Sequence, residues 1–176
     1  MNIVIAIIFI SVIGTLLHFM YEWSGHNKVV SLFAAVNEST WEHIKIALTP
    51  TFIWTLYDGA VYGLNPNYFE AKALSILVII VLIPLLFYAY QLITKKAILP
   101  IDITIFYLTI IISNLVFYYI INIESLHFFY TYISVIVLFI IFGSYMVLTL
   151  LPIKKLLIQR SNNQKIWNKR TLSSWT

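Results

Sequence analysis

The sequence has 176 residues, of which 61% are hydrophobic and only 10% are charged, and its formal net charge is +4. Soluble domains usually carry about 25% charged residues, so a chain this poor in charge is best explained by a lipid-facing surface. Because cysteine is absent, disulfides, thiolate nucleophiles and thiolate metal ligands are excluded. Any functional site must be built from histidine, carboxylate, amide, hydroxyl and aromatic groups.

Long apolar segments follow one another along the chain. The first runs from Ile3 to about Phe19 and, with the next two residues, has the length of a membrane-spanning helix, about 20 residues. The second begins at Ser39, because the run Ser39 to Glu42 is typical of a capping box, and ends near Tyr62. Three further spans are predicted at about 71–93, 101–121 and 126–151.

The apolar piece from Val29 to Val36 lies between the first two spans and is too short to cross a bilayer. We expect it to be interfacial or re-entrant. The predicted fold class is therefore an all-α integral membrane bundle of about five transmembrane helices. Residues 1–152 are predicted to form a single transmembrane domain, and residues 153–176 a basic cytoplasmic tail.

Basic residues are concentrated in this tail, which holds six of the eleven lysines and arginines. By the positive-inside rule the tail belongs in the cytoplasm, and about five spans then place the N-terminus outside. The chain is expected to be a multi-pass plasma-membrane protein whose main partner is the lipid bilayer, with contact between the tail and anionic lipid. The same orientation places residues 22–45 at the cytoplasmic face. A nucleic-acid partner is not expected.

A dense group of polar residues lies at the end of the first span and the start of the second. His18 and Glu22 are four residues apart, as are Glu38 and Glu42, and His43 follows directly. Side chains at this spacing share one face of a helix, and converging imidazoles and carboxylates are the ligands that zinc or another divalent metal needs. The same groups also suit proton transfer. The predicted metal ligands are His18, Glu22, Glu38 and His43, and the predicted catalytic residues are Glu38, Glu42 and His43.

Four more residues are candidates for the same pocket, and each also has a structural interpretation. Asn37 directly precedes the acidic residues, and the expected helix cap does not explain why an amide is present at this position. Trp41 is typical of an interface anchor. Asp102 begins the fourth span, where a helix N-terminus favours a negative charge. Asn114 lies near the middle of that span, where an amide needs a hydrogen-bond partner or lines a cavity. Glu42 likewise has the structural role of the capping-box acid.

Two sequence blocks in the N-terminal third carry a family resemblance. The first, from His18 to Asn27, reads HFxYEWSGxN, and the second, from Val36 to Lys45, reads VNESxWEHxK. In this order and separation they resemble a family of uncharacterised small prokaryotic membrane proteins, known as a domain of unknown function; the run from Asp102 to Phe106 also fits. The resemblance implies a polytopic helical bundle and functional roles without a known reaction. These roles fall on His18, Glu22, Asn37, Glu38, Trp41, Glu42 and His43.

Three functions are compatible with these residues. The first is a metal-dependent membrane enzyme that acts on a lipid-like substrate, with a divalent ion such as zinc as its cofactor. The second is a small permease or an ion- or proton-coupled carrier, in which the same groups bind a cation or a proton. The third is a membrane scaffold or accessory subunit, in which the polar groups only connect the loop to the bundle.

Overall fold

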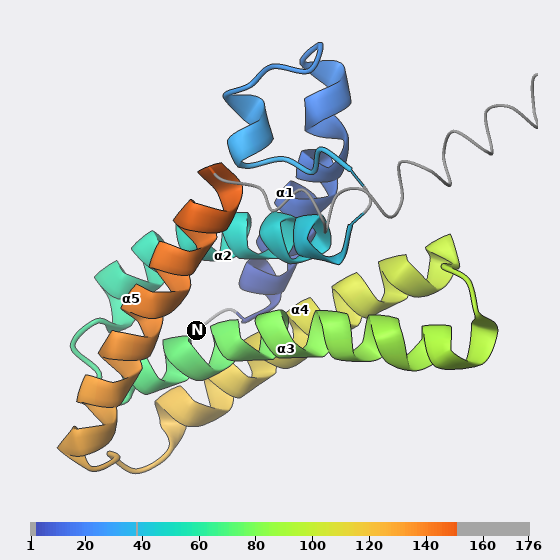
Figure 1. Ribbon diagram of the computed structural model, residues 1–176. Coiled ribbons are helices and arrows are strands. Elements are labelled where there is room, and N and C mark those ends of the chain that lie inside the picture. Colours follow the sequence, from blue (N-terminus) through green and yellow to red (C-terminus); the bar gives the residue numbers. More distant parts are fainter. Residues whose placement is uncertain (1–2, 38, 151–176) are drawn as a thin grey trace, which may run out of the picture.

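The computed structural model describes residues 3–37 and 39–150, and every regular element in this part of the chain is helical. The elements follow one another as shown in Figure 1. They are α1 (Ile3–Trp23), the short 3-10 helix η1 (Val30–Leu32), α2 (Thr40–Tyr62), α3 (Tyr68–Thr94), α4 (Leu99–Asn122) and α5 (Phe128–Leu150). The all-α prediction is confirmed, and the helices begin and end within a few residues of their predicted limits. Glu38 and the predicted tail 153–176 lie outside the described residues.

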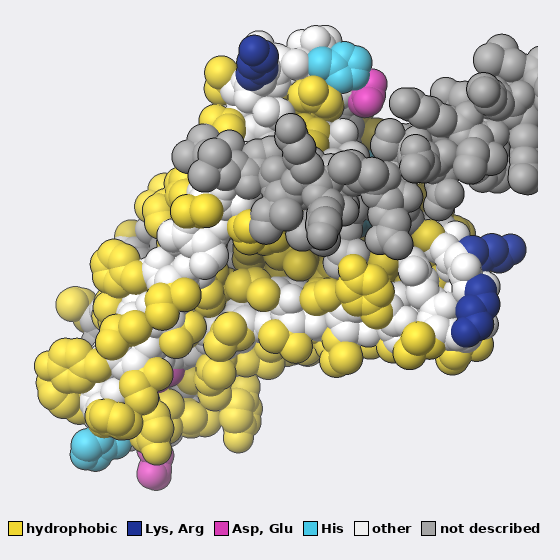
Figure 2. Space-filling model, viewed as in Figure 1, with side chains coloured by type: hydrophobic (Ala, Val, Ile, Leu, Met, Phe, Trp, Pro, Cys, Tyr) yellow, Lys and Arg dark blue, Asp and Glu magenta, His cyan; other side chains and the backbone are white. Residues whose placement is uncertain are grey.

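Four helices in the described part are long and apolar enough to cross a membrane, namely α1, α3, α4 and α5. In Figure 2, hydrophobic side chains cover the helical body, while the charged groups and histidines on this face lie toward its edges. This is the surface of a multi-pass membrane protein. α2, which we also expected to be a span, has the length but not the apolarity of the other four, because it carries Glu42, Lys45 and Asp58.

α2 nevertheless runs through the inside of the bundle. Near its start, His43 lines a small cavity together with Phe87 from the second half of α3. Near its end, Asp58 pairs with Lys72 from the start of α3. The two helices are therefore antiparallel neighbours over most of their lengths. Every residue from Ile44 to Thr51 is buried, so this part of α2 contacts protein, while the apolar helices provide the lipid-facing surface.

α1 to α4 share one hydrophobic core, and each contributes a fully buried aliphatic side chain to it: Ile10, Leu48, Ile76 and Ile110. Within the core, α3 and α4 form the most extensive helix pair. At one end of this pair, the buried Asn67 side chain binds the turn between α4 and α5. Its amide group donates to the carbonyls of Ile120, Ile123 and Glu124 and accepts from the amide of Leu126.

Candidate functional site

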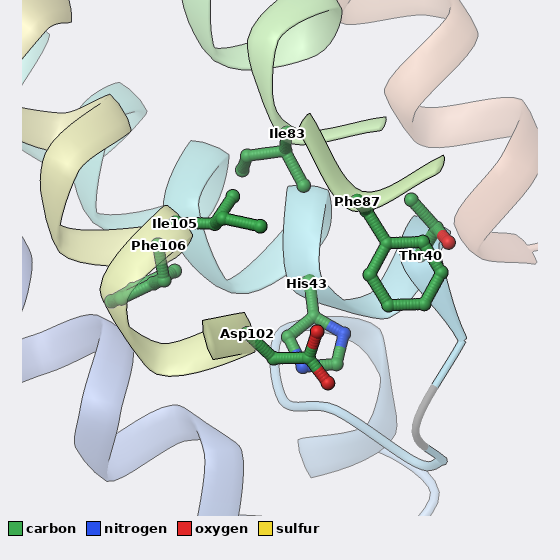
Figure 3. Close-up of a pocket in the computed structure, with 7 residues that line it drawn as sticks. All are labelled: Thr40, His43, Ile83, Phe87, Asp102, Ile105 and Phe106. Carbon is green, nitrogen blue, oxygen red and sulfur yellow. The ribbon is translucent and has the colours of Figure 1, made fainter. Parts of the chain in front are cut away.

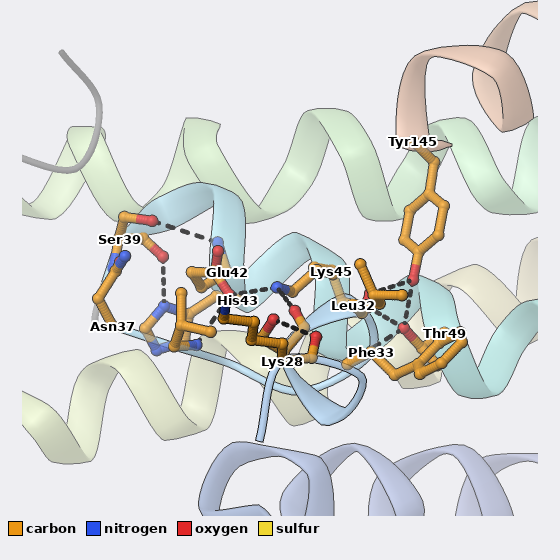
Figure 4. A network of polar contacts seen from close by, with 12 residues as sticks. Lys28, Leu32, Phe33, Asn37, Ser39, Glu42, His43, Lys45, Thr49 and Tyr145 are labelled. Atoms are coloured by element: carbon orange, nitrogen blue, oxygen red, sulfur yellow. Dashed lines mark hydrogen bonds and ion pairs between the residues drawn. The ribbon is translucent and has the colours of Figure 1, made fainter. Parts of the chain in front are cut away.

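The most buried polar group of the N-terminal region is an ion pair between Glu42 and Lys45 on α2. The Lys45 Nζ lies 2.7 Å from a carboxylate oxygen of Glu42, and both side chains are less than 5% exposed. Each partner also binds the preceding loop, because the amide of Val36 donates to Glu42 at 3.0 Å and Lys45 donates to the carbonyl of Ser31 at 2.9 Å (Figure 4). The pair therefore holds the loop against α2.

The capping box is realised only in part. Ser39 Oγ accepts from the amide of Glu42 at 3.4 Å, as predicted. The amide of Ser39, however, donates to Asn37 Oδ1 at 2.8 Å, whereas the carboxylate of Glu42 turns to Val36 and Lys45. The sequence pattern identified the helix start but not the partner of its acidic residue. Glu42 thus has its carboxylate engaged in the loop network, and its catalytic role stays a prediction.

The segment predicted to be interfacial or re-entrant packs over the first half of α2 and is held there from two sides. The amide of Ala35 donates to the carbonyl of Leu17 on α1 at 3.2 Å. On the other side, Thr49 Oγ1 on α2 and the Tyr145 hydroxyl on α5 lie 2.8 Å apart, and Tyr145 donates to the carbonyl of Leu32 at 3.4 Å. Residues 29–36 are thereby connected to three helices.

Three of the predicted site residues come together at a cavity between α1, α2 and α4. The cavity has a volume of about 340 Å³. His18 approaches it from α1, His43 from α2 and Asp102 from the first turn of α4, and the two imidazole rings lie 5.7 Å apart, centroid to centroid. The other lining residues are mainly apolar or aromatic: Thr15, Phe19, Ile46, Leu99, Ile103, Phe106 and Tyr107.

His43 and Asp102 are each oriented by a neighbouring polar group. The Nδ1 of His43 lies 3.0 Å from the carbonyl oxygen of Ser39, and because a carbonyl only accepts, Nδ1 carries the hydrogen of this contact. The hydroxyl of Tyr90 donates to Asp102 and accepts from the amide of Ile98 at 3.2 Å. Figure 3 shows the Asp102 carboxylate beside the His43 ring.

A second, much smaller cavity adjoins this pair. It has a volume of about 10 Å³ and is lined by His43, Asp102 and five other residues. That volume is about what one water molecule needs, and Thr40 adds a polar wall to it. The histidine–aspartate pair thus lies between a water-sized cavity and a ligand-sized one.

The remaining predicted residues lie elsewhere. Glu22 pairs with the exposed His26 at 3.4 Å in the turn that follows α1, Trp41 packs against Tyr145, and the amide of Asn114 donates to a carbonyl of its own helix at 2.9 Å. Glu38 is outside the described residues. Among residues 3–37 and 39–150, no three histidine or carboxylate side chains are close enough to hold a metal ion, so the predicted four-ligand metal site is not assembled there.

Sequence reasoning missed a second buried charged group near the opposite end of α2. Asp58 pairs with Lys72, whose ammonium group lies 4.3 Å from the centroid of the Phe117 ring. Glu70 is also buried, and it accepts from Thr131 on α5 at 2.6 Å. The available signal was that Lys72 falls inside a predicted span, where a charge needs a partner.

The fold and the cavity define the class of protein: a multi-pass helical membrane protein with polar groups gathered around an inner polar helix. The chain belongs to a family of unknown function, DUF6512, whose sequence profile matches residues 1–165. No curated protein and no solved structure matches the chain. The family confirms the resemblance seen in the two N-terminal blocks and assigns no reaction to the cavity.

Proposed function

We propose that this protein binds an amphipathic molecule from the membrane in the cavity between α1 and α4, and that His43 moves a proton at the polar group of this molecule. The observation that carries the proposal is the convergence of His18, His43 and Asp102 on a cavity whose other walls are mainly apolar or aromatic. A few polar groups in an apolar wall are typical of small-molecule sites, where they fix the orientation of the ligand.

The proton chemistry follows from the partners of His43. With its Nδ1 hydrogen donated to Ser39, a neutral His43 accepts a proton at Nε2 from a substrate hydroxyl or from a water molecule. The neighbouring Asp102 carboxylate, oriented by Tyr90, stabilises the imidazolium that then forms. This makes the protein a candidate membrane enzyme that uses general base catalysis on a lipid-like substrate.

The position of the cavity favours this proposal over a carrier. Asp102 lies in the first turn of α4, close to the turn that carries Lys95 and Lys96, whereas carriers usually bind their substrates near the bilayer midplane. We assign this end to the cytoplasmic face of the plasma membrane, because Lys28 also lies in a loop at this end of the bundle and basic residues favour that side. Contact of residues 153–176 with anionic lipid remains part of the proposal.

Photolabelling in lipid nanodiscs tests the proposal. The protein is reconstituted with a long-chain alcohol that carries a diazirine in its chain, and labelled peptides are mapped by mass spectrometry. We expect labels to concentrate around Phe19 and in residues 99–107. His43→Gln should lower this labelling about ten-fold, which corresponds to one hydrogen bond of about 1.4 kcal/mol.

His127→Gln is the matched control, because His127 is exposed in the turn before α5, at the other end of the bundle. It should leave the labelling unchanged. Labels spread evenly over the lipid-facing helices, with no response to His43→Gln, would contradict the proposal.

A further inference from the structure

We infer that Thr15 and Tyr107 close the end of the cavity that lies opposite its polar residues, and that they limit the length of the alkyl chain that the cavity accepts. This inference rests on the proposed function. Among the lining residues, Thr15 is the one farthest from the polar end along α1, and Tyr107 is the one farthest along α4. Their hydroxyl oxygens lie 2.8 Å apart. This hydrogen bond joins the two helices at the end of the cavity farthest from His18, His43 and Asp102, at the exposed edge of the helix pair, where Tyr107 is 36% exposed.

The helices pack closely beside this hydrogen bond. Phe106 lies against Gly14 of α1, where a Cβ atom would be only 2.7 Å from the Phe106 Cζ and 2.9 Å from the carbonyl oxygen of Ile46. α1, α2 and α4 are therefore in direct contact one residue away from Thr15 and Tyr107. An alkyl chain that stays between α1 and α4 must stop there or displace the Tyr107 ring.

One side of the cavity is lined by residues that are exposed to lipid, and an alkyl chain can enter there. Phe19 on α1 and Leu99 and Ile103 on α4 line the cavity, and each is 46% to 60% exposed on the lipid-facing surface. A chain can therefore come laterally from the bilayer between the two helices. Tyr107 is five positions after Asp102, which is about 7.5 Å along a helix. The ligand class that fits is an amphiphile with a single, short alkyl chain.

A series of diazirine-bearing alcohols of increasing chain length tests this inference at equal mole fractions in nanodiscs. For the wild-type protein, we expect labelling of residues 99–107 by the longest chains to be about ten-fold below that by the best chain, because methylenes that reach the Tyr107 ring overpack the space between α1 and α4. Tyr107→Ala should restore labelling by the long chains. Tyr107→Leu, which removes less volume, should restore it in part and serves if the alanine variant does not fold.

Two controls separate the effect of the ring from general effects. Tyr107→Phe keeps the ring and should keep the wild-type length profile. Tyr118→Ala removes an exposed tyrosine from the same helix, outside the cavity, and should also leave the profile unchanged.

The outcomes distinguish this inference from the proposed function. Labelling of the cavity with the same length profile in wild type, Tyr107→Ala and Tyr107→Leu overturns the role of Tyr107 and leaves the proposed function standing. If no chain length labels the wild-type cavity above the lipid-facing helices, the proposed function fails and the inference fails with it.

Discussion

Glu42 and Lys45 illustrate how buried charged residues in a membrane protein can hold a loop against a helix. Both side chains are buried, neither lines the cavity, and both bind the backbone of the loop before α2. An ion pair of this kind gains little over apolar residues of the same volume, but breaking it leaves an uncompensated buried charge. The protein should therefore be stable when both partners are present or both are replaced, and clearly less stable when only one is replaced.

We predict that Lys45→Met alone lowers the free energy of unfolding by about 3–5 kcal/mol, because it leaves the Glu42 carboxylate without its cation. The double variant Glu42→Gln/Lys45→Met should lose clearly less, since no charge remains buried. Unfolding by SDS in mixed micelles measures both. A double variant that is less stable than Lys45→Met would show that the ion pair itself provides the stability.

Residue by residue, the sequence was a better guide to which polar side chains gather at the cavity than to the partners of each side chain. His18, His43 and Asp102 could be named because histidine and carboxylate groups are costly in an apolar segment and need a reason to be there. Tyr90 and Tyr107 could not, because tyrosine is common in membrane helices and its hydroxyl gains a role only from the packing of α3, α4 and α1. Pairs such as Asp58 and Lys72, on different helices, leave no local pattern.

At the scale of the elements, the close approach of α1 to its neighbours depends on Gly14. The Cβ that any other residue would add meets both the Phe106 ring and the backbone oxygen of Ile46. A side chain tip can move aside, but a helix backbone cannot without separating α1 from α2. The packing of the cavity walls therefore rests on the absence of a side chain at this position.

We predict that Gly14→Ala lowers the free energy of unfolding by about 1–3 kcal/mol, as expected for overpacking. Gly143→Ala is its control, because a Cβ at Gly143 on α5 meets no atom within 4 Å, and alanine is the better helix former. The same mixed-micelle unfolding applies. Equal stability of the two alanine variants would mean that α1 packs less closely than the structure shows.

The helices themselves were predicted well because three strong local signals agree: apolar length, polar turns and the Ser39 cap. α2 was the element least understood from the sequence. Its Glu42, Lys45 and Asp58 reduce its apolarity, yet it lies inside the bundle and runs antiparallel to α3. Only the tertiary arrangement shows that these charges face protein.

For the whole molecule, we propose that this membrane protein holds an amphipathic ligand in the cavity between α1, α2 and α4. Composition alone indicated the membrane, and the two N-terminal blocks indicated where polar groups gather. The cavity itself was not predictable, because its walls come from segments nearly 90 residues apart in the sequence, around Phe19 and Tyr107. That juxtaposition is a property of the fold.

The most direct test is to identify the molecules that co-purify with the protein from its native membrane. Wild type is compared with Ile103→Trp, which fills the cavity from its lipid-facing side, and with Leu108→Trp, a control on the exposed surface of the same helix outside the cavity. We predict that native mass spectrometry finds a single-chain amphiphile bound near one to one in wild type and Leu108→Trp, and lost in Ile103→Trp. The same bound molecules in all three proteins, or none in wild type, would contradict it.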